Sequence, residues 1–345
     1  MQNSECGMRN NQGQKFHSKE DRKRKLFLLF ACAAFIAAVF FSSQIAENGR
    51  FALKVCAETI IPSLFPFFIL SGLVSRLGLP VFLGNSFSGC AGRLFGVSGA
   101  GITALFMGLT GGYPMGAGYI AELVRQGQID LEESEKLLAF CNNSGPAFII
   151  GAVGCGVFGS VKIGACLYIV HIFSAVSVGF LLRGEKSNFS FPEDRKPAAL
   201  RTELSFPVAF TEAVRTAVSS IINVCGFAVF FTVMVRLAEN IPSVTRFLDQ
   251  LSMISTLDPA CLRTLFSGFF ELGCSVSEMA ALPPTPSNLA LVSFILGWGG
   301  LSVHLQTRAL LSDTEIKGAL HTAGHLMSAS LGSVLSYLLF SFLKI

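Results

Sequence analysis

The chain has 345 residues, of which 51% are hydrophobic and 14% are charged, and its mean hydropathy is +0.58. Soluble domains carry about 25% charged residues, so this composition excludes an ordinary soluble protein and indicates one that lies in a membrane. The net charge of +4 gives no reason to expect a nucleic acid as partner. The ten cysteines show no zinc-like spacing and are expected to pack as small apolar residues.

A polar segment at residues 1–25 ends in a basic run and is followed by an apolar run at 26–41. A cleaved signal peptide begins similarly, but no small-x-small cleavage pattern follows, and more apolar segments come after. We therefore expect a retained first membrane helix whose basic flank, the tail 1–25, lies in the cytoplasm.

The rest of the chain divides into two halves around a polar linker at 184–207. The first membrane helix and a first repeat fill 26–183, and a second repeat fills 208–345. Apolar blocks follow the first helix at 51–77, 97–125, 132–160 and 163–182, and after the linker at 210–237, 261–281, 288–310 and 316–342.

Residues recur between the halves at a nearly constant offset. Arg236 follows Arg76 by 160 residues (236 − 76), and the Phe-x-Gly motif at 106–108 recurs at 266–268 with the same offset. His325 follows His171 by 154 residues (325 − 171), and Ser-Ala follows three residues after each. This register predicts a duplicated chain.

The basic residues predict how the halves are oriented. The tail and the linker are both rich in Lys and Arg, so the positive-inside rule places both in the cytoplasm and residues 46–50 outside. Three apolar blocks lie between Arg76 and Arg183, but the chain must cross an even number of times. One block must therefore be a re-entrant hairpin, and the repeats are then inverted. The predicted fold is an all-α polytopic membrane protein with inverted repeats, interrupted helices and re-entrant hairpins.

A Gly- and Pro-containing segment interrupts the apolar block at 97–125. It contributes Gly111, Gly112, Tyr113, Pro114 and Gly116. An unpaired backbone group in hydrocarbon costs several kcal/mol, so such a break is tolerated only inside protein or beside water. Transporters with inverted repeats use such breaks to bind solute and ions. We therefore predict that these residues line a substrate site; a plain glycine-rich crossing is the alternative.

A second interruption lies within the block at 132–160. It consists of Asn142, Asn143, Ser144, Gly145 and Pro146. Pro146 lacks an N–H donor, and the polar side chains lie at membrane depth, where such residues are functional candidates. Their alternative role is to join helices by hydrogen bonds.

The second half has interruptions at corresponding positions. Glu271 corresponds to Gly111 and Gly299 to Gly145. Glu271 is the one acid within 265–277 and is expected to bind a cation, to carry a coupling H+ or to accept a bond from the substrate; a water-exposed helix end is the alternative. The predicted binding residues of this half are Glu271, Ser275, Gly299, Gly300, Ser302 and Gln306.

His321 and His325 lie one helical turn apart, a spacing that suits a metal. No third ligand is evident, so we predict that they form hydrogen bonds between helices. The sequence gives no cofactor or metal, and leaves H+ or Na+ open as a coupling ion.

With these motifs in view, the chain resembles the YlbJ-type family of sporulation integral membrane proteins, within the group that carries the nucleoside-recognition "Gate" domain. The resemblance covers most of 26–345 and rests on the motif at 111–117, the acidic helix 122–140 leading into 142–148, and Gly151-Ala-Val-Gly154. It implies a multi-pass protein of an endospore-forming bacterium, in the cell membrane or the outer forespore membrane. It also implies a role in exporting dipicolinic acid from the mother cell toward the forespore.

Three functions follow for comparison. The first is a secondary transporter for a small planar solute, with the lipid bilayer and that solute as partners and a homo-oligomer left open. A nucleoside-type transporter is the second, although the carboxylate and asparagine sequences usual there are not reproduced. The third is a non-transporting scaffold of a sporulation complex. An enzyme is not expected, because no Ser/His/Asp, HExxH, Walker or dinucleotide pattern is present.

Overall fold

The computed structural model describes residues 22, 25–29, 31–183, 205–255 and 257–345. Most of the predicted basic tail and most of the linker fall outside them. The described residues form helices joined by turns and short loops, and five of these helices are long and apolar enough to cross a bilayer: Ser42–Arg76, Val161–Leu181, Phe206–Glu239, Pro286–Leu310 and Ala319–Leu343. The chain is therefore an all-α polytopic membrane protein.

The chain separates into two units, 1–50 and 51–345. In the first unit a turn at Phe41 precedes helix α2 (Ser42–Val55). Residues 46–50, which the sequence places outside the membrane, are part of α2; their position relative to the membrane stays a prediction.

The described elements from residue 61 onward fall into two series of seven. The first is α3 (Ile61–Arg76), α4 (Leu79–Leu94), α5 (Gly99–Gly111), α6 (Met115–Arg125), α7 (Leu131–Cys141), the π-helix η2 (Ala147–Val157) and α8 (Val161–Leu181). The second is α9 (Phe206–Glu239), α10 (Pro242–Ser255), α11 (Pro259–Phe270), α12 (Leu272–Met279), α13 (Pro286–Trp298), α14 (Gly300–Leu310) and α15 (Ala319–Leu343). A duplicated chain would have this order of elements, while the inverted relation of its halves stays a prediction.

Helices α4 and α10 were not predicted from the sequence. Helix α4 contains three glycines and a proline, residues that usually mark loops, and α10 mixes charged with apolar residues. Each follows the long first helix of its half, so the two complete the parallel between the series.

Polar residues explain where several helices begin. The Ser98 side chain accepts a hydrogen bond from the Gly101 N–H at the start of α5, and Asp258 does so from the Ala260 N–H at the start of α11. Such caps typically contribute about 1 kcal/mol. The two caps are 160 residues apart (258 − 98), the offset found in the sequence.

Helices α3 and α9 pack along each other through small residues. Buried positions recur every fourth residue on both helices, at Leu64, Phe68 and Gly72 on α3 and at Ala209, Ala213, Ala217 and Ile221 on α9. A Cβ added at Gly72 would lie 3.5 Å from the Ala213 Cβ. Small residues allow helices in membranes to approach this closely.

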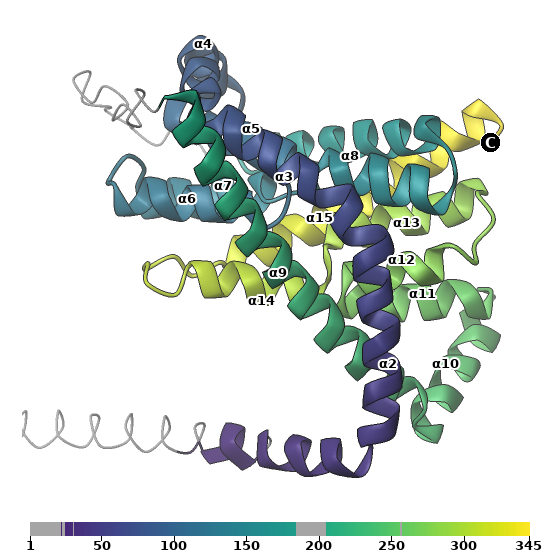
Figure 1. Cartoon of the computed structure of the whole chain (residues 1–345). Coiled ribbons are helices and arrows are strands. Elements are labelled where there is room, and N and C mark those ends of the chain that lie inside the picture. The colour runs from purple at the N-terminus through teal and green to yellow at the C-terminus, as the bar shows by residue number, and fades with distance from the viewer. Residues whose placement is uncertain (1–21, 23–24, 30, 184–204, 256) are drawn as a thin grey trace, which may run out of the picture. The chain divides into compact units, whose positions relative to one another are not determined.

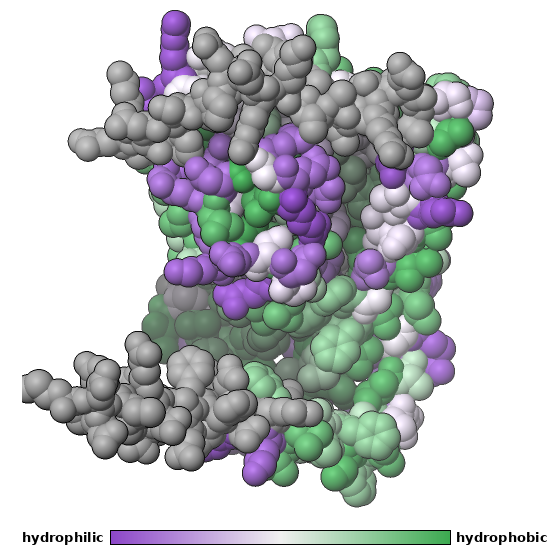
Figure 2. Space-filling model, turned by 90° about the vertical axis from the view of Figure 1, so that its left-hand side faces the viewer, coloured by the Kyte–Doolittle hydropathy of each residue, from purple (hydrophilic) through white to green (hydrophobic). Residues whose placement is uncertain are grey.

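Outward-facing side chains of the long helices are strongly apolar. On α8 Phe173 is 62% exposed, and on α15 Phe342 is 83% exposed. Helices α8, α13 and α15 run alongside one another (Figure 1). On the face drawn in Figure 2, hydrophobic residues cover much of the lower part and hydrophilic residues gather above them. Exposed apolar surface of this extent is typical of contact with lipid.

Candidate functional site

The first interruption separates α5 from α6 at residues 112–114. Gly112 has a φ of +74°, a conformation that favours glycine, and the Tyr113–Pro114 peptide bond is cis. A Cβ added at Gly112 would lie 2.8 Å from the backbone nitrogen of Gly145. The first interruption therefore touches the second directly, backbone against backbone.

Two further glycines allow α5 and α6 to approach the end of α7. A Cβ added at Gly108 or at Gly116 would overlap the carbonyl oxygen of Cys141. Gly116, predicted as a binding residue, thus has a packing role in the structure and does not line the cavity described below.

The second interruption separates α7 from η2 and is held by hydrogen bonds. The Asn143 side-chain amide donates to the Phe140 carbonyl at 2.7 Å. The Ser144 N–H donates to His171 Nε2 at 3.2 Å, and the Ser144 hydroxyl donates to the Leu296 carbonyl at 3.2 Å. These contacts satisfy polar groups that would otherwise be costly at this depth.

The interruptions of the second half repeat this arrangement. Glu271 separates α11 from α12, and Gly299 and Gly300, with φ of +79° and +85°, separate α13 from α14. A Cβ added at Gly300 would lie 3.1 Å from the Glu271 Cα, and one at Gly299 would lie 2.9 Å from the Tyr113 hydroxyl. The two interruptions therefore touch within each half, and Tyr113 links one half to the other.

A cavity of about 60 Å³ lies where the interruptions meet. Seven of the predicted residues line it: Gly111, Gly112, Tyr113, Ser144, Gly145, Glu271 and Gln306. The other nine do not: Pro114, Gly116, Asn142, Asn143, Pro146, Ser275, Gly299, Gly300 and Ser302. Several of the latter support the lining instead, as Gly300 does by packing on Glu271.

The apolar wall of the cavity was missed by the sequence interpretation. It is formed by Ile60, Leu64, Phe68, Ala147, Phe148, Val224, Leu272 and Val303, with Gly273. In the sequence these residues look like any others of an apolar helix. A signal was present only in the spacing of Ile60, Leu64 and Phe68, which places them on one face of their helix.

Glu271 is the one acidic residue of the cavity lining and is only 5% exposed. Its backbone is extended, with a φ of −153°, because the helix stops there. A buried carboxylate in an apolar wall is costly unless its charge is balanced. Such a group is suited to holding a cation or proton, or to accepting hydrogen bonds from a solute.

A second polar group lies beside the cavity without lining it. Asn142 donates to the Thr307 hydroxyl at 2.9 Å and contacts His321 Nε2 at 3.1 Å, while His325 Nδ1 lies 3.2 Å from the Trp298 carbonyl. The prediction that His321 and His325 form hydrogen bonds between helices is confirmed. In the part of the chain that the structure describes, no cluster of three or more His, Cys, Asp and Glu residues is placed to hold a metal ion.

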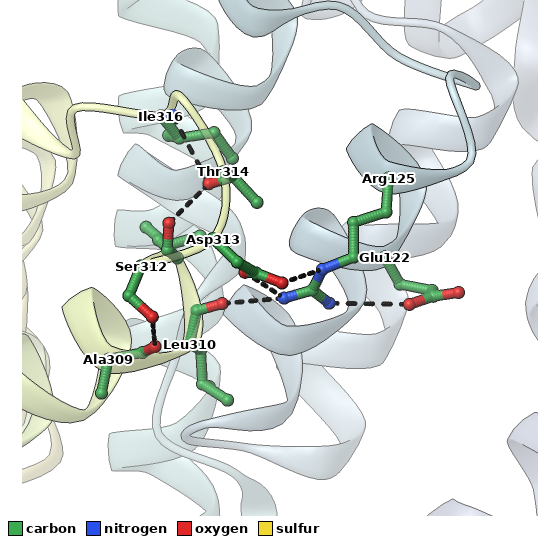
Figure 3. A network of polar contacts seen from close by, with 9 residues as sticks. Glu122, Arg125, Ala309, Leu310, Ser312, Asp313, Thr314 and Ile316 are labelled. Carbon is green, nitrogen blue, oxygen red and sulfur yellow. Dashed lines mark hydrogen bonds and ion pairs between the residues drawn. The ribbon is translucent and has the colours of Figure 1, made fainter.

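An ion pair joins the halves outside the membrane-spanning helices (Figure 3). At the end of α6, Arg125 Nη2 and Nε donate to the two carboxylate oxygens of Asp313 at 2.7 and 3.0 Å, and Nη2 also donates to the Leu310 carbonyl. The hydrogen bonds from Arg125 hold the pKa of the Asp313 carboxyl below its usual value. Nearby, Glu135 accepts from the N–H groups of Lys317 and Gly318 at 2.5 and 2.8 Å.

Comparison with known proteins identifies the family. The chain is 32% identical to the sporulation integral membrane protein YlbJ of Bacillus subtilis (strain 168) over 315 residues, covering 84% of this chain and 76% of the relative. The chain belongs to the YlbJ family. No family model and no solved structure matches it. It is thus a sporulation-related integral membrane protein, and the YlbJ-type resemblance seen in its motifs is confirmed.

Proposed function

We propose that this YlbJ-family chain is a secondary transporter for a small planar solute, and that the solute is dipicolinic acid moving from the mother cell toward the forespore across the outer forespore membrane. The observation that carries the proposal is the meeting of four helix interruptions at one buried cavity. Three of them line it directly, and the fourth reaches it through Gly300, which packs on Glu271. Paired interruptions in corresponding segments are typical of transporter binding sites.

Contacts between the halves support the same proposal because they occur in corresponding pairs. Helix α6 contacts α14, and their counterparts α12 and η2 contact each other; likewise α7 contacts α15, and α13 contacts α8. Pairs of this kind are expected when two similar bodies face each other across a two-fold axis. Transporters with such halves expose their site to either side by moving one against the other.

The lining of the cavity suits a flat, polar aromatic solute. Phe68, Tyr113 and Phe148 offer ring faces and edges, while Ser144 and Gln306 offer hydrogen-bond donors. Dipicolinate is a pyridine ring with two carboxylates, so it needs donors at both ends of the ring. Glu271 would repel a dianion and must therefore be protonated or hold a cation when this solute is bound.

The cavity must widen to admit such a solute. One water needs about 10–15 Å³ by the same measure, so the present volume holds about four waters. The hydrogen bonds that join the interruptions across the halves, such as that from the Ser144 hydroxyl to the Leu296 carbonyl, would have to break. The present conformation is therefore too narrow to hold the solute under this proposal.

The test is uptake of radiolabelled dipicolinate by proteoliposomes that contain the full chain. We expect uptake in the wild type and its loss in Glu271→Gln and Gly112→Ala, since the alanine would meet the Gly145 backbone at a strained φ. Gly226→Ala on α9 is the matched control, because a Cβ there has open space around it. We expect that control to keep wild-type uptake.

Three outcomes decide between the functions. Uptake of uridine and not of dipicolinate would favour a nucleoside-type transporter. Absence of uptake of either solute, with normal sporulation of cells carrying Glu271→Gln, would overturn transport. Stable capture of another sporulation protein by both wild type and variant would then point to a scaffold.

A further inference from the structure

Three imidazole rings gather where α14, α15 and the end of α13 meet. The ring centroids lie 4.2 Å apart for His321 and His325, 4.9 Å for His304 and His321, and 5.2 Å for His304 and His325. The three residues are 5%, 2% and 3% exposed for His304, His321 and His325. None of them lines the cavity.

The direction of each hydrogen bond in this cluster follows from Asn142. Its Oδ1 accepts from the Ala117 N–H at 3.3 Å, so its Nδ2 faces His321 and donates to Nε2 at 3.1 Å. His321 therefore carries its hydrogen on Nδ1, which lies 3.2 Å from His304 Nδ1 and donates to it. His304 then carries its hydrogen on Nε2, which is buried and has no partner within the described residues.

This arrangement is closed to a further proton. In the His304–His321 pair, the two nitrogens that lack hydrogen, His321 Nε2 and His304 Nδ1, already accept from Asn142 and from His321. A proton added to either would set two N–H donors against each other at 3.1 or 3.2 Å. Uptake of a proton must therefore break one of these two contacts. The contact between Asn142 and His321 holds the second interruption to α15. Protonation of His321 Nε2 would therefore break the contact between Asn142 and α15.

The charges around the pair decide when a proton can bind. Arg308 on α14, His325 on α15 and, through His325, His171 on α8 all oppose added positive charge. From the neighbouring α7, Glu135 Oε1 accepts from two N–H groups at the start of α15, while its Oε2 is buried and has no hydrogen-bond partner among the described residues; Arg125 of α6 pairs with Asp313. An incoming anionic solute is a further source of negative charge, and it would favour protonation.

We propose that His304 and His321 form a proton-binding site that takes up a proton with each anionic solute and so couples the two movements. The inference rests on the proposed transport function and adds the coupling ion to it. The interruptions carry no Lys or Arg, so they offer no positive charge to a carboxylate solute. A protonated imidazole supplies that charge.

Trp298, the chain's one tryptophan, reports on this site directly. Its indole lies 4.4 Å from the His304 ring, and an imidazolium quenches indole fluorescence far more strongly than neutral imidazole does. In detergent-solubilised full-length protein, we expect dipicolinate to move the quenching of Trp298 to higher pH. The shift should be lost in His304→Gln and in His321→Gln.

Proton movement is measured separately in proteoliposomes that contain a pH-sensitive dye. We expect a dipicolinate gradient to drive protons in the same direction in the wild type, and to drive none in His321→Gln. Glutamine offers Asn142 an acceptor but cannot hold the proton, so dipicolinate exchange at equal pH should persist in that variant. Gly226→Ala on α9 is the matched control: an added Cβ there has open space around it, and the number of protons moved per solute should stay at the wild-type value.

The outcomes distinguish the proton-coupling site from the transport function on which it rests. Dipicolinate uptake without proton movement in the wild type would overturn the coupling site alone. So would proton movement that survives in both His304→Gln and His321→Gln. Absence of dipicolinate uptake by the wild type would overturn the proposed function, and the coupling with it.

Discussion

The imidazole of His171 accepts a hydrogen bond from the backbone N–H of Ser144, with Nε2 and N 3.2 Å apart. His325 makes the corresponding contact in the second half, where its Nδ1 lies 3.2 Å from the Trp298 carbonyl oxygen. Both pairs are separated by the same offset of 154 residues (325 − 171 and 298 − 144). Each histidine joins the interruption of its own half to the last long helix of that half. The repeated contact supports a duplicated architecture through chemistry that composition alone would not produce.

Gly116 should be far less tolerant of substitution than Gly118, two residues along the same helix. In Gly116→Ala the new methyl group would overlap the Cys141 carbonyl, whereas in Gly118→Ala it would lie 3.9 Å from a flexible leucine side chain. Overpacking of this kind lowers the free energy of unfolding by about 1–3 kcal/mol. Thermal unfolding of the purified variants in detergent measures the difference. Equal melting temperatures for the two variants would contradict the close approach of α6 to α7.

Inverted repeats predict that corresponding loops face opposite sides of the membrane. Gln126 follows α6 and Ala281 follows α12, its counterpart in the second half, and both are exposed. In a background without other reactive cysteines, Gln126→Cys and Ala281→Cys should react with an impermeant maleimide from opposite sides. Asp313→Cys should react from the same side as Gln126→Cys, because Arg125 pairs with Asp313. Labelling of all three from one side would show parallel repeats instead.

The Arg125–Asp313 pair should contribute to stability only where Asp313 is ionised. Its pKa is lowered by hydrogen bonds from Arg125, so the contribution is complete above the ordinary value of 3.8 and is lost as the pH falls through the lower, folded-state pKa. Asp313→Asn should lower the melting temperature at neutral pH, and less so in high salt.

The Lys136–Glu132 pair provides the control for this effect, since both of its residues lie on α7. Glu132→Gln should change the melting temperature less than Asp313→Asn does. A loss in Asp313→Asn that is independent of both pH and salt would show that the ion pair is not its cause.

Tyr113→Phe should weaken solute binding without unfolding the chain. Its hydroxyl lies at the cavity, 3.5 Å from the Leu296 carbonyl and beside the Ser144 side chain, where a solute can reach it. A hydrogen bond to a charged group contributes about 1.5–3 kcal/mol, which corresponds to a rise in the dissociation constant for dipicolinate of roughly ten-fold or more. Tyr337→Phe on α15, whose ring is half exposed, should bind as the wild type does. Calorimetric titration with dipicolinate compares the two variants.

The sequence was most informative where backbone chemistry is unusual. Gly112, Pro146 and Gly299 stand out in apolar runs, and a helix begins or ends beside each of them. Glycine and proline act locally, so their effect does not depend on what lies across the fold. The same local rule misjudged α4, whose glycines are accommodated inside a helix.

The residues that line the cavity were harder to predict from the sequence, because they depend on which helix faces pack against each other. Val224 and Phe173 are both apolar residues of long helices, yet one lines the cavity and the other is 62% exposed. Asn142 was expected to face a solute, but its amide bonds Thr307 and contacts His321, partners more than 160 residues away. Partnerships of this range are set by the packing of the two halves and leave no trace in local periodicity.

The contact of Gly112 with Gly145 has a consequence for how the site responds to mutation. Both positions are closed to any side chain, yet neither offers a solute more than its peptide group. A systematic alanine scan of this region would therefore rank its glycines among the most sensitive positions, ahead of residues that carry functional groups. Loss of activity on substitution at these positions measures how closely two stretches of main chain pack. Only variants that preserve this packing report on how the solute is bound.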